Sequence, residues 1–334
     1  MKLKHIYKTL KRFPKAKLNQ YETPIFKLDN FKQKMNLSAD IYMKRDDLNG
    51  LGIGGNKVRN LEYLLGDAIS RGRYTIIASG TAQSNLCALA AACGNKMNLK
   101  TILVHNDDEP EVDEGNVILN KLFGAETIYL GPVDSSVRAE KVEELSKKLK
   151  EEGKKPYIIH NGASTPLGSL GYVEALLELH EQDKDMELGI KHLFVPGGNG
   201  GLAAGVIVGN ALLEDPYTLH VVSVEYPLQE LNLILEDLVY GTLELMGIKH
   251  DSPFEHVVIH DEYMGEGWGV ETSESVQAIY DLAKYEGILL EKVYTAKTFY
   301  GMTDIIEENK ITKPCCFLHS GGMGALFSQF GGRK

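Results

Sequence analysis

Strand-like and helix-like segments alternate along most of this chain of 334 residues, and no other feature constrains the fold as strongly. Such alternation is typical of parallel sheets with helices on both faces, so we expect an α/β protein, and the length suggests two domains. Residues 182–187 are expected to form a polar loop, and 247–272 show no clear period. Strands are expected at 74–79, 101–105, 127–130, 157–160, 192–195, 219–225 and 315–319. Helices are expected at 56–71, 85–95, 116–123, 136–152, 171–181, 201–213, 228–245, 274–286 and 298–309.

The composition is that of an ordinary globular protein, with 43% hydrophobic and 25% charged residues. A formal net charge of −10 argues against a nucleic-acid partner, which would need a basic face. No apolar run approaches the roughly eighteen residues that a membrane span requires. The basic first 17 residues lack the apolar core of a secretion signal. We therefore expect a cytoplasmic protein with no membrane partner.

Neither the cysteines nor the histidines are spaced as metal ligands are, so we expect no catalytic metal. In a cytoplasmic protein the cysteines are expected to be reduced, and small buried hydrophobic residues describe them best. There are four: Cys87, Cys93, Cys315 and Cys316.

A lysine follows a glycine-rich turn in the segment Gly54-Gly55-Asn56-Lys57. Glycine takes positive φ at little cost and lets a ligand approach the backbone closely. The helix expected at 56–71 has an apolar stripe that would hold its first turn in place. Lys57 is thus placed to present its amine to a carbonyl ligand. A Schiff base at this lysine would make the chain a pyridoxal-phosphate enzyme.

Polar residues follow the strand expected at 74–79 and end in Ser84-Asn85. Ligands of α/β proteins bind at loops that follow the carboxyl ends of parallel strands. Ser84 and Asn85 are therefore candidate binding residues. The alternative for Ser84 is a helix N-cap with no further role, because serine is a preferred N-cap residue.

A second glycine-rich loop, from Gly197 to Leu202, lies between a strand and a helix. Successive N–H groups at the start of a helix bind anions, and the helix dipole adds to this attraction, so a phosphate is a natural guest. The same loop satisfies the fingerprint G-x-G-x-x-G/A of dinucleotide sites, and Glu225 closes the next expected strand where a ribose-binding acid is sought. From the loop alone, a phosphate and a dinucleotide are nearly equal interpretations.

Two later segments hold further candidates. Ser320 lies in a glycine turn after the last expected strand, where it could face a ligand or cap the closing helix. Tyr294 and Thr295 precede the helix expected at 298–309. Tyr294 could equally be a core aromatic residue with a satisfied hydroxyl.

These segments together resemble the family of D-cysteine desulfhydrases and 1-aminocyclopropane-1-carboxylate deaminases, which are pyridoxal-phosphate lyases of the tryptophan synthase β fold (fold type II). The most specific part joins Lys44-Arg45-Asp46-Asp47-Leu48 to Lys57-Val58-Arg59. Matching segments in one order are more specific than a single glycine loop, so the dinucleotide interpretation is disfavoured. The other matching segments are 21–24, 81–85, 114–125, 166–172, 286–295 and 319–322.

The resemblance implies two open, twisted parallel-sheet domains with the cofactor between them. Residues 1–48 and 162–334 would form the large domain, and 49–161 a small inserted domain. It implies pyridoxal 5′-phosphate as the cofactor and a homodimer as the assembly. Lys57 would hold the cofactor and then move protons. The further cofactor-binding residues would be Asn85 at the 3′ oxygen, Gly197, Gly198, Asn199, Gly200, Gly201 and Leu202 at the phosphate, Thr295 at the ring nitrogen, and Ser320.

The resemblance also implies a small amino acid as the substrate. Gln83 and Ser84 would hold its carboxylate, and Ser84 and Tyr294 would be catalytic, with Tyr294 near the α carbon or the leaving group. Trp268 would contact the substrate as well. The deaminase branch usually has Glu at the position of Thr295, and the desulfhydrase branch has Thr.

Thr295 therefore favours β-elimination of D-cysteine to pyruvate, sulfide and ammonia. The alternative is deamination of 1-aminocyclopropane-1-carboxylate. Four departures from the family pattern are also compatible with a different class of function, that of a paralogue which binds cofactor or amino acid without turnover. They are Asn60 for a phosphate-binding Lys, Leu86 for His, Leu202 for Thr and Trp268 for Tyr.

Overall fold

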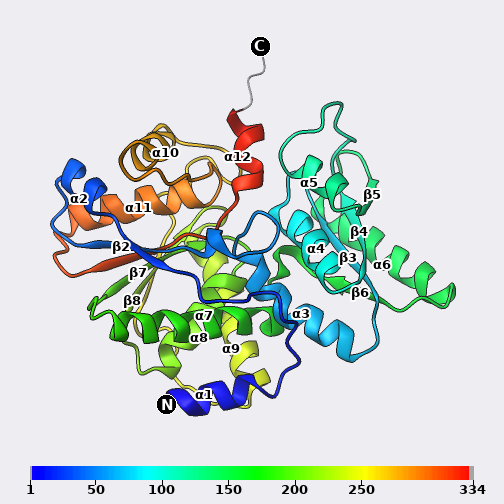
Figure 1. Cartoon of the computed structure of the whole chain (residues 1–334), viewed down its shortest axis with the longest axis horizontal. Coiled ribbons are helices and arrows are strands. Elements are labelled where there is room, and N and C mark those ends of the chain that lie inside the picture. The colour runs from blue at the N-terminus through cyan, green and yellow to red at the C-terminus, as the bar shows by residue number, and fades with distance from the viewer. Residues whose placement is uncertain (1, 331–334) are drawn as a thin grey trace.

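The computed structural model describes residues 2–330, which form two sheets flanked by helices (Figure 1). The fold is α/β, as the alternation of strands and helices predicts. The strands are β1 (Ile25–Lys27), β2 (Ile41–Lys44), β3 (Thr75–Gly80), β4 (Lys100–His105), β5 (Glu126–Tyr129), β6 (Pro156–Ile159), β7 (His192–Gly197), β8 (Thr218–Ser223), β9 (Val257–His260) and β10 (Cys315–Leu318).

The helices differ in length, from single turns to long α-helices. Two short 3-10 helices are η1 (Asp46–Leu48) and η2 (Asn161–Ala163). The α-helices are α1 (Leu3–Leu10), α2 (Asp29–Met35), α3 (Lys57–Ser70), α4 (Asn85–Lys96), α5 (Asn116–Leu122), α6 (Ser135–Glu151), α7 (Pro166–Asp185), α8 (Gly201–Leu212), α9 (Leu228–Met246), α10 (Ser273–Glu286), α11 (Thr295–Glu308) and α12 (Met323–Phe330).

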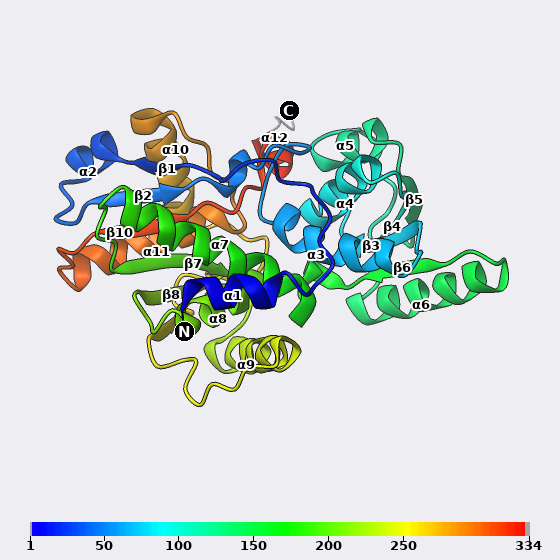
Figure 2. The same cartoon turned by 60° about the horizontal axis from the view of Figure 1, so that its bottom comes forward.

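The larger sheet has the strand order β1-β2-β10-β7-β8-β9, and its four central strands are buried on both faces. All neighbouring strands in it are parallel except β1, which runs antiparallel to β2 at the edge. Successive side chains of β10 point to opposite faces. Cys316 and Leu318 therefore pack with α7, α8 and α9, whereas Cys315 and Phe317 pack with α2, α10 and α11. Figure 2 shows α1 lying beside α7 on the first of these faces.

The smaller sheet has the order β5-β4-β3-β6, and all its strands are parallel. Helices α3 and α4 cover one face, and α6 covers the other. Its four strands follow one another within 75–159, whereas the strands of the larger sheet come from both sides of that range. The domain boundaries at 48/49 and 161/162 stay predictions. Residues 1 and 331–334 of the predicted large domain lie outside the described residues.

Most predicted elements agree with the structure to within a few residues, but three differ. Residues 182–187 were expected to be a loop, and this expectation is wrong, because α7 continues to Asp185 on a half-buried polar stretch. The strand expected at 219–225 ends at Ser223, so Glu225 lies in the following loop. The stretch 247–272 contains the short edge strand β9. Residues 2–330 include no helix with the length and apolarity needed to cross a bilayer.

Candidate active site

A cavity of about 340 Å³ lies where the carboxyl ends of the two sheets approach each other. Its walls include Thr81 after β3 and Asn161 after β6 in the smaller sheet. The larger sheet contributes Gly198 after β7 and Glu225 after β8. Ligands of parallel α/β sheets bind in this position, beyond the carboxyl ends of the strands.

Lys57 is the first residue of α3, and its side chain lines this cavity. The turn before it requires glycine, because Gly54 has φ +76° and an added Cβ would lie 1.9 Å from the carbonyl oxygen of Asp47. Lys57 Nζ donates a hydrogen bond of 2.6 Å to the carbonyl oxygen of Gly162. Burial lowers the pKa of the Lys57 amine to about 8, and the nearby Glu225 carboxylate opposes this shift. A substantial fraction of the amine is therefore neutral near pH 8.

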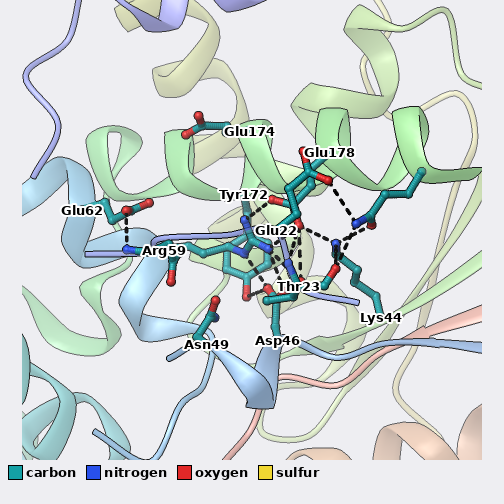
Figure 3. Close-up of polar contacts among 12 residues, drawn as sticks. Glu22, Thr23, Lys44, Asp46, Asn49, Arg59, Glu62, Tyr172, Glu174 and Glu178 are labelled. Atoms are coloured by element: carbon teal, nitrogen blue, oxygen red, sulfur yellow. Dashed lines mark hydrogen bonds and ion pairs between the residues drawn. The ribbon is translucent and has the colours of Figure 1, made fainter. Parts of the chain in front are cut away.

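A buried ionic cluster holds the first turn of α3 against α7 (Figure 3). The guanidinium of Arg59 lies 2.8 Å from Asp46 Oδ2 and 2.9 Å from Glu178 Oε2. The hydroxyl of Tyr172 also donates to Asp46, over 2.7 Å. Lys44 pairs with Glu178, so two cations and two carboxylates compensate one another. Because Arg59 lies two residues after Lys57, this cluster fixes the backbone that carries the Lys57 amine.

The loop before α8 has the geometry of an anion site. Gly200 has φ +83°, and an added Cβ would lie 2.9 Å from Ile234, so the turn excludes larger residues. The N–H of Gly201 donates to Ser164 Oγ over 3.1 Å. Four further backbone N–H groups have no hydrogen-bond partner within residues 2–330: those of Gly198, Asn199, Gly200 and Leu202. Free N–H groups at the start of a helix favour a phosphate.

The loop after β3 is held by one asparagine on α5. The Nδ2 of Asn116 donates to Asn85 Oδ1 and to the backbone oxygen of Gln83, each over 2.8 Å. This leaves the Asn85 amide N–H₂ to donate into the cavity. The side chain of Gln83 accepts from the Asn116 N–H and donates to the Glu114 oxygen, so both ends of its amide are engaged. Ser84 is the N-cap of α4, as its alternative interpretation predicts, and it also lines the cavity.

Tyr294 and Trp268 form a hydrogen-bonded pair at the cavity wall. The indole N–H of Trp268 donates to the phenolic oxygen of Tyr294 over 2.8 Å. Burial raises the pKa of Tyr294, and the Trp268 hydrogen bond opposes this shift. The phenol is thus protonated across the physiological range and keeps its O–H to donate.

Thr295 does not line the cavity. It is fully buried, and its hydroxyl bonds the backbone N–H and carbonyl of Glu291. The Glu291 side chain lines the cavity instead and accepts from the N–H groups of Val293, Tyr294 and Thr295. The assignment of Thr295 to the cofactor's ring nitrogen stays a prediction.

Most predicted site residues converge on this one cavity. Gly197 does not, because it ends β7 and packs against Leu231 and Val221. Of the four departures, Asn60 is buried elsewhere and donates to the Gly168 oxygen. The predicted residues that line the cavity are Lys57, Gln83, Ser84, Asn85, Gly198, Asn199, Gly200, Gly201, Leu202, Trp268, Tyr294 and Ser320, together with Leu86.

Sequence reasoning did not identify several residues of the cavity wall as parts of this site. From the sequence, Glu225 is a candidate only for a ribose-binding acid. In the structure it lies near Lys57, and its Oε2 is buried with no hydrogen-bond partner among the described residues. Ser164 could have been suspected, because it precedes a matching segment. Arg138 carried no signal, because α6 has the composition of an ordinary charged surface helix.

These residues fit pyridoxal phosphate. An amine with a lowered pKa faces free N–H groups that suit a phosphate, and an amide N–H₂ is directed into the same space. The cavity volume is also within the range of small-molecule sites.

Comparison with known proteins agrees with this geometry. Residues 16–321 match the model of the family described as pyridoxal-phosphate dependent enzyme. A Pyrococcus abyssi protein, provisionally named a 1-aminocyclopropane-1-carboxylate deaminase, is 39% identical over 95% of this chain and 94% of its own length. A D-cysteine desulfhydrase of Klebsiella pneumoniae is 32% identical over 96% of this chain and 97% of its own.

A solved structure extends this likeness to the fold. The crystal structure of an ACC deaminase homologue superimposes with a TM-score of 0.89 at 36% identity, covering 97% of each chain. The cofactor is pyridoxal phosphate, and the fold is fold type II, as the resemblance implied. The chain belongs to the family of pyridoxal-phosphate-dependent enzymes and is related to the 1-aminocyclopropane-1-carboxylate deaminases and D-cysteine desulfhydrases.

Proposed function

We propose that the protein catalyses β-elimination of D-cysteine, consuming water and releasing pyruvate, sulfide and ammonia. The observation that carries this proposal is the juxtaposition of Lys57, an amine with a pKa near 8, and Tyr294, a protonated phenol, in one cavity. Elimination needs a base for the α proton and an acid for the departing thiolate. The two side chains supply one of each.

When bound, pyridoxal phosphate withdraws electrons from the substrate's α carbon, which makes the α proton removable. Lys57 would hold the cofactor, and its Nζ would accept that proton. Its lowered pKa favours the neutral amine that this step requires. Ser84 and the start of α4 would orient the substrate, and Leu86 and Leu202 would exclude water.

Tyr294 would donate its phenolic proton to the leaving sulfur. Its oxygen already accepts from Trp268, so its own O–H is free to donate into the cavity. The indole N–H would then stabilise the phenolate that forms. In sequence, Thr295 matches the desulfhydrase branch, although its side chain does not line the cavity and is hydrogen-bonded to the backbone of Glu291.

A direct test is to measure sulfide and pyruvate release from D-cysteine and L-cysteine by the cofactor-loaded enzyme. We expect equimolar products from D-cysteine, lost in Lys57→Ala and retained in Lys96→Ala, which removes an exposed lysine at the end of α4. Parent-rate turnover by Lys57→Ala would refute the role of Lys57. Absence of sulfide from D-cysteine in the wild type would refute the substrate.

A second candidate is deamination of 1-aminocyclopropane-1-carboxylate, which is favoured by the 39% identity to the Pyrococcus abyssi protein. This reaction gives 2-oxobutanoate and ammonia without sulfide. Comparing both substrates at equal concentration therefore separates the two reactions. A third possibility, a paralogue that binds without turnover, predicts a spectral change with both amino acids and product from neither.

A further inference from the structure

A buried arginine faces the cavity without an acidic partner. Arg138, in the first turn of α6, is 6% exposed and lines the cavity. Among residues 2–330, no carboxylate lies within ion-pair distance of its guanidinium, and its buried Nε has no hydrogen-bond partner. Burying a cation without a compensating charge costs free energy, so binding of an anion beside it stabilises the protein.

Two amides hold the guanidinium in place. Its Nη1 donates to Asn106 Oδ1 over 2.5 Å, and its Nη2 donates to Asn161 Oδ1 over 3.3 Å. Burial lowers the pKa of Arg138, and the Asp107 carboxylate opposes this shift from beyond ion-pair distance. That carboxylate accepts a hydrogen bond from the backbone N–H of Ala82. Amide partners fix the geometry of a guanidinium and leave its charge unneutralised.

Two anionic groups are expected in this cavity, the phosphate of the cofactor and the carboxylate of an amino acid. The loop from Gly198 to Leu202 already offers four free N–H groups for a phosphate. Asn161 stands between Arg138 and this loop, because its Nδ2 donates to Asn199 Oδ1 over 2.8 Å. The arginine is therefore separated from the phosphate loop by one amide and belongs to the part of the cavity wall that α6 and the smaller sheet form.

That wall lacks a charged group for the carboxylate. The amide of Gln83, the residue expected to bind it, is engaged with Glu114 and Asn116. Ser84 supplies one hydroxyl, whose oxygen accepts from the Cys87 N–H. A guanidinium matches a carboxylate in geometry and charge.

We propose that Arg138, oriented by Asn106 and Asn161, binds the carboxylate of the amino-acid substrate. The proposal rests on the proposed function only in requiring an amino-acid ligand, not D-cysteine itself. It makes Arg138 a specificity residue, because an amine without a carboxylate leaves the guanidinium unpaired. Charge-assisted hydrogen bonds of this kind correspond to roughly tenfold to hundredfold in affinity.

The test compares cysteine with cysteamine, which has the same thiol and amine but no carboxylate. Dissociation constants are measured by stopped flow from the visible absorption change of the cofactor-loaded protein before turnover. Both cysteine enantiomers are measured, and the constant of the tighter-binding one is used. The quantity of interest is the ratio of the cysteamine constant to the cysteine constant. We expect a high ratio in the wild type and a fall of about tenfold to hundredfold in Arg138→Met.

The control is Lys141→Met, on the same helix one turn later, where the lysine is exposed and pairs with Glu144. This variant should keep the wild-type ratio. Arg138→Lys, which keeps the charge without the planar fork, should give an intermediate ratio and serves if the methionine variant does not fold. An unchanged ratio in both Arg138 variants, or a wild type that binds cysteamine as tightly as either cysteine, would overturn the proposal.

The phosphate alternative is tested by comparing pyridoxal phosphate with pyridoxal as ligands of the apoprotein. If Arg138→Met weakens binding of the phosphorylated form alone, the arginine serves the phosphate and the proposal is wrong. Failure of the proposed function would look different. The protein would release no sulfide from D-cysteine, but the dependence of the cysteine-to-cysteamine ratio on Arg138 would persist.

Discussion

The indole N–H of Trp268 lies 2.8 Å from the phenolic oxygen of Tyr294 and donates a hydrogen bond to it. The indole is 44% exposed, whereas Tyr294 is half-buried, and both residues line the cavity. The pair thus combines a group that can donate a proton with a group that can only stabilise the resulting charge. Trp268 therefore changes the chemistry of this position without removing the proton donor.

Replacing the indole should weaken catalysis moderately. Trp268→Phe removes the N–H, which is worth about 1 kcal/mol or roughly fivefold in rate if the bond is kept in the transition state. We expect kcat/KM for the best substrate to fall by about that factor. Tyr294→Phe, which removes the proton donor itself, should cost at least a hundredfold. Equal losses in the two variants would contradict this division of roles.

The fluorescence of Trp268 should report on the cavity. The chain has a single tryptophan, and it lines the cavity wall. We expect titration of the apoprotein with pyridoxal phosphate to quench its emission until the site is saturated. Free tryptophan at the same cofactor concentrations corrects for absorption of light by the cofactor. Quenching no stronger than in that control would show that the cofactor binds away from Trp268.

Reconstitution with cofactor should depend on pH through Lys57. Only the neutral amine attacks a carbonyl, and burial lowers the pKa of Lys57 to about 8 from an ordinary value near 10.5. The rate at which the apoprotein gains visible absorption should therefore rise with pH and level off above about pH 8. Free lysine amines should continue to gain reactivity up to about pH 10.4. A rise that continues to pH 10 would show that burial does not lower the pKa of Lys57.

The sequence specified the fold and most of the cavity but not its charge balance. Hydrophobic periodicity and clusters of glycine located the turn before Lys57 and the loop at Gly200. Glycine is recognisable at such turns because it is favoured where φ is positive. The remaining features depend on distant segments that meet only in three dimensions. Arg138 reaches the cavity because β6 and α6 lie beside β3, and Glu291 replaces Thr295 at the wall because of the backbone at the start of α11.

A chain of histidines across β7, β8 and β9 should make stability sensitive to acid. His220 bonds His192 over 3.1 Å and His260 over 3.0 Å, and burial lowers its pKa to about 3. Because the unfolded histidine titrates near 6.5, protons favour unfolding as pH falls from about 6.5 towards 3. This contribution amounts to about 2 kcal/mol at pH 5.

The variant His220→Phe tests this contribution, because phenylalanine can still stack on Phe194. We expect the free energy of unfolding, measured in urea at pH 7 and pH 5, to change less with pH in the variant than in the wild type. His5→Phe, which removes an exposed histidine on α1 outside this chain of hydrogen bonds, is the control. An identical pH dependence in His220→Phe and the wild type would contradict the assignment.

The ionic cluster around Arg59 should contribute both to the stability of the fold and to the positioning of Lys57. Arg59→Met removes the cation that faces Asp46 and Glu178, and it leaves Asp46 fully buried with Lys44 as the remaining cation of the cluster. Removing one partner of a buried ion pair typically lowers the free energy of unfolding by about 3–5 kcal/mol. We expect a loss of that size in the free energy of unfolding, measured in urea on the apoprotein.

The matched control is Arg71→Met, at the other end of α3. Arg71 is 63% exposed and pairs with Asp67 four residues earlier, so its loss should cost at most about 0.5 kcal/mol. Because Arg59 also holds the turn that carries Lys57, the Arg59 variant should reconstitute with cofactor more slowly than the wild type at the same pH, while Arg71→Met should not. A destabilised Arg59→Met protein that reconstitutes at the wild-type rate would mean that the cluster stabilises the fold but does not position the Lys57 amine.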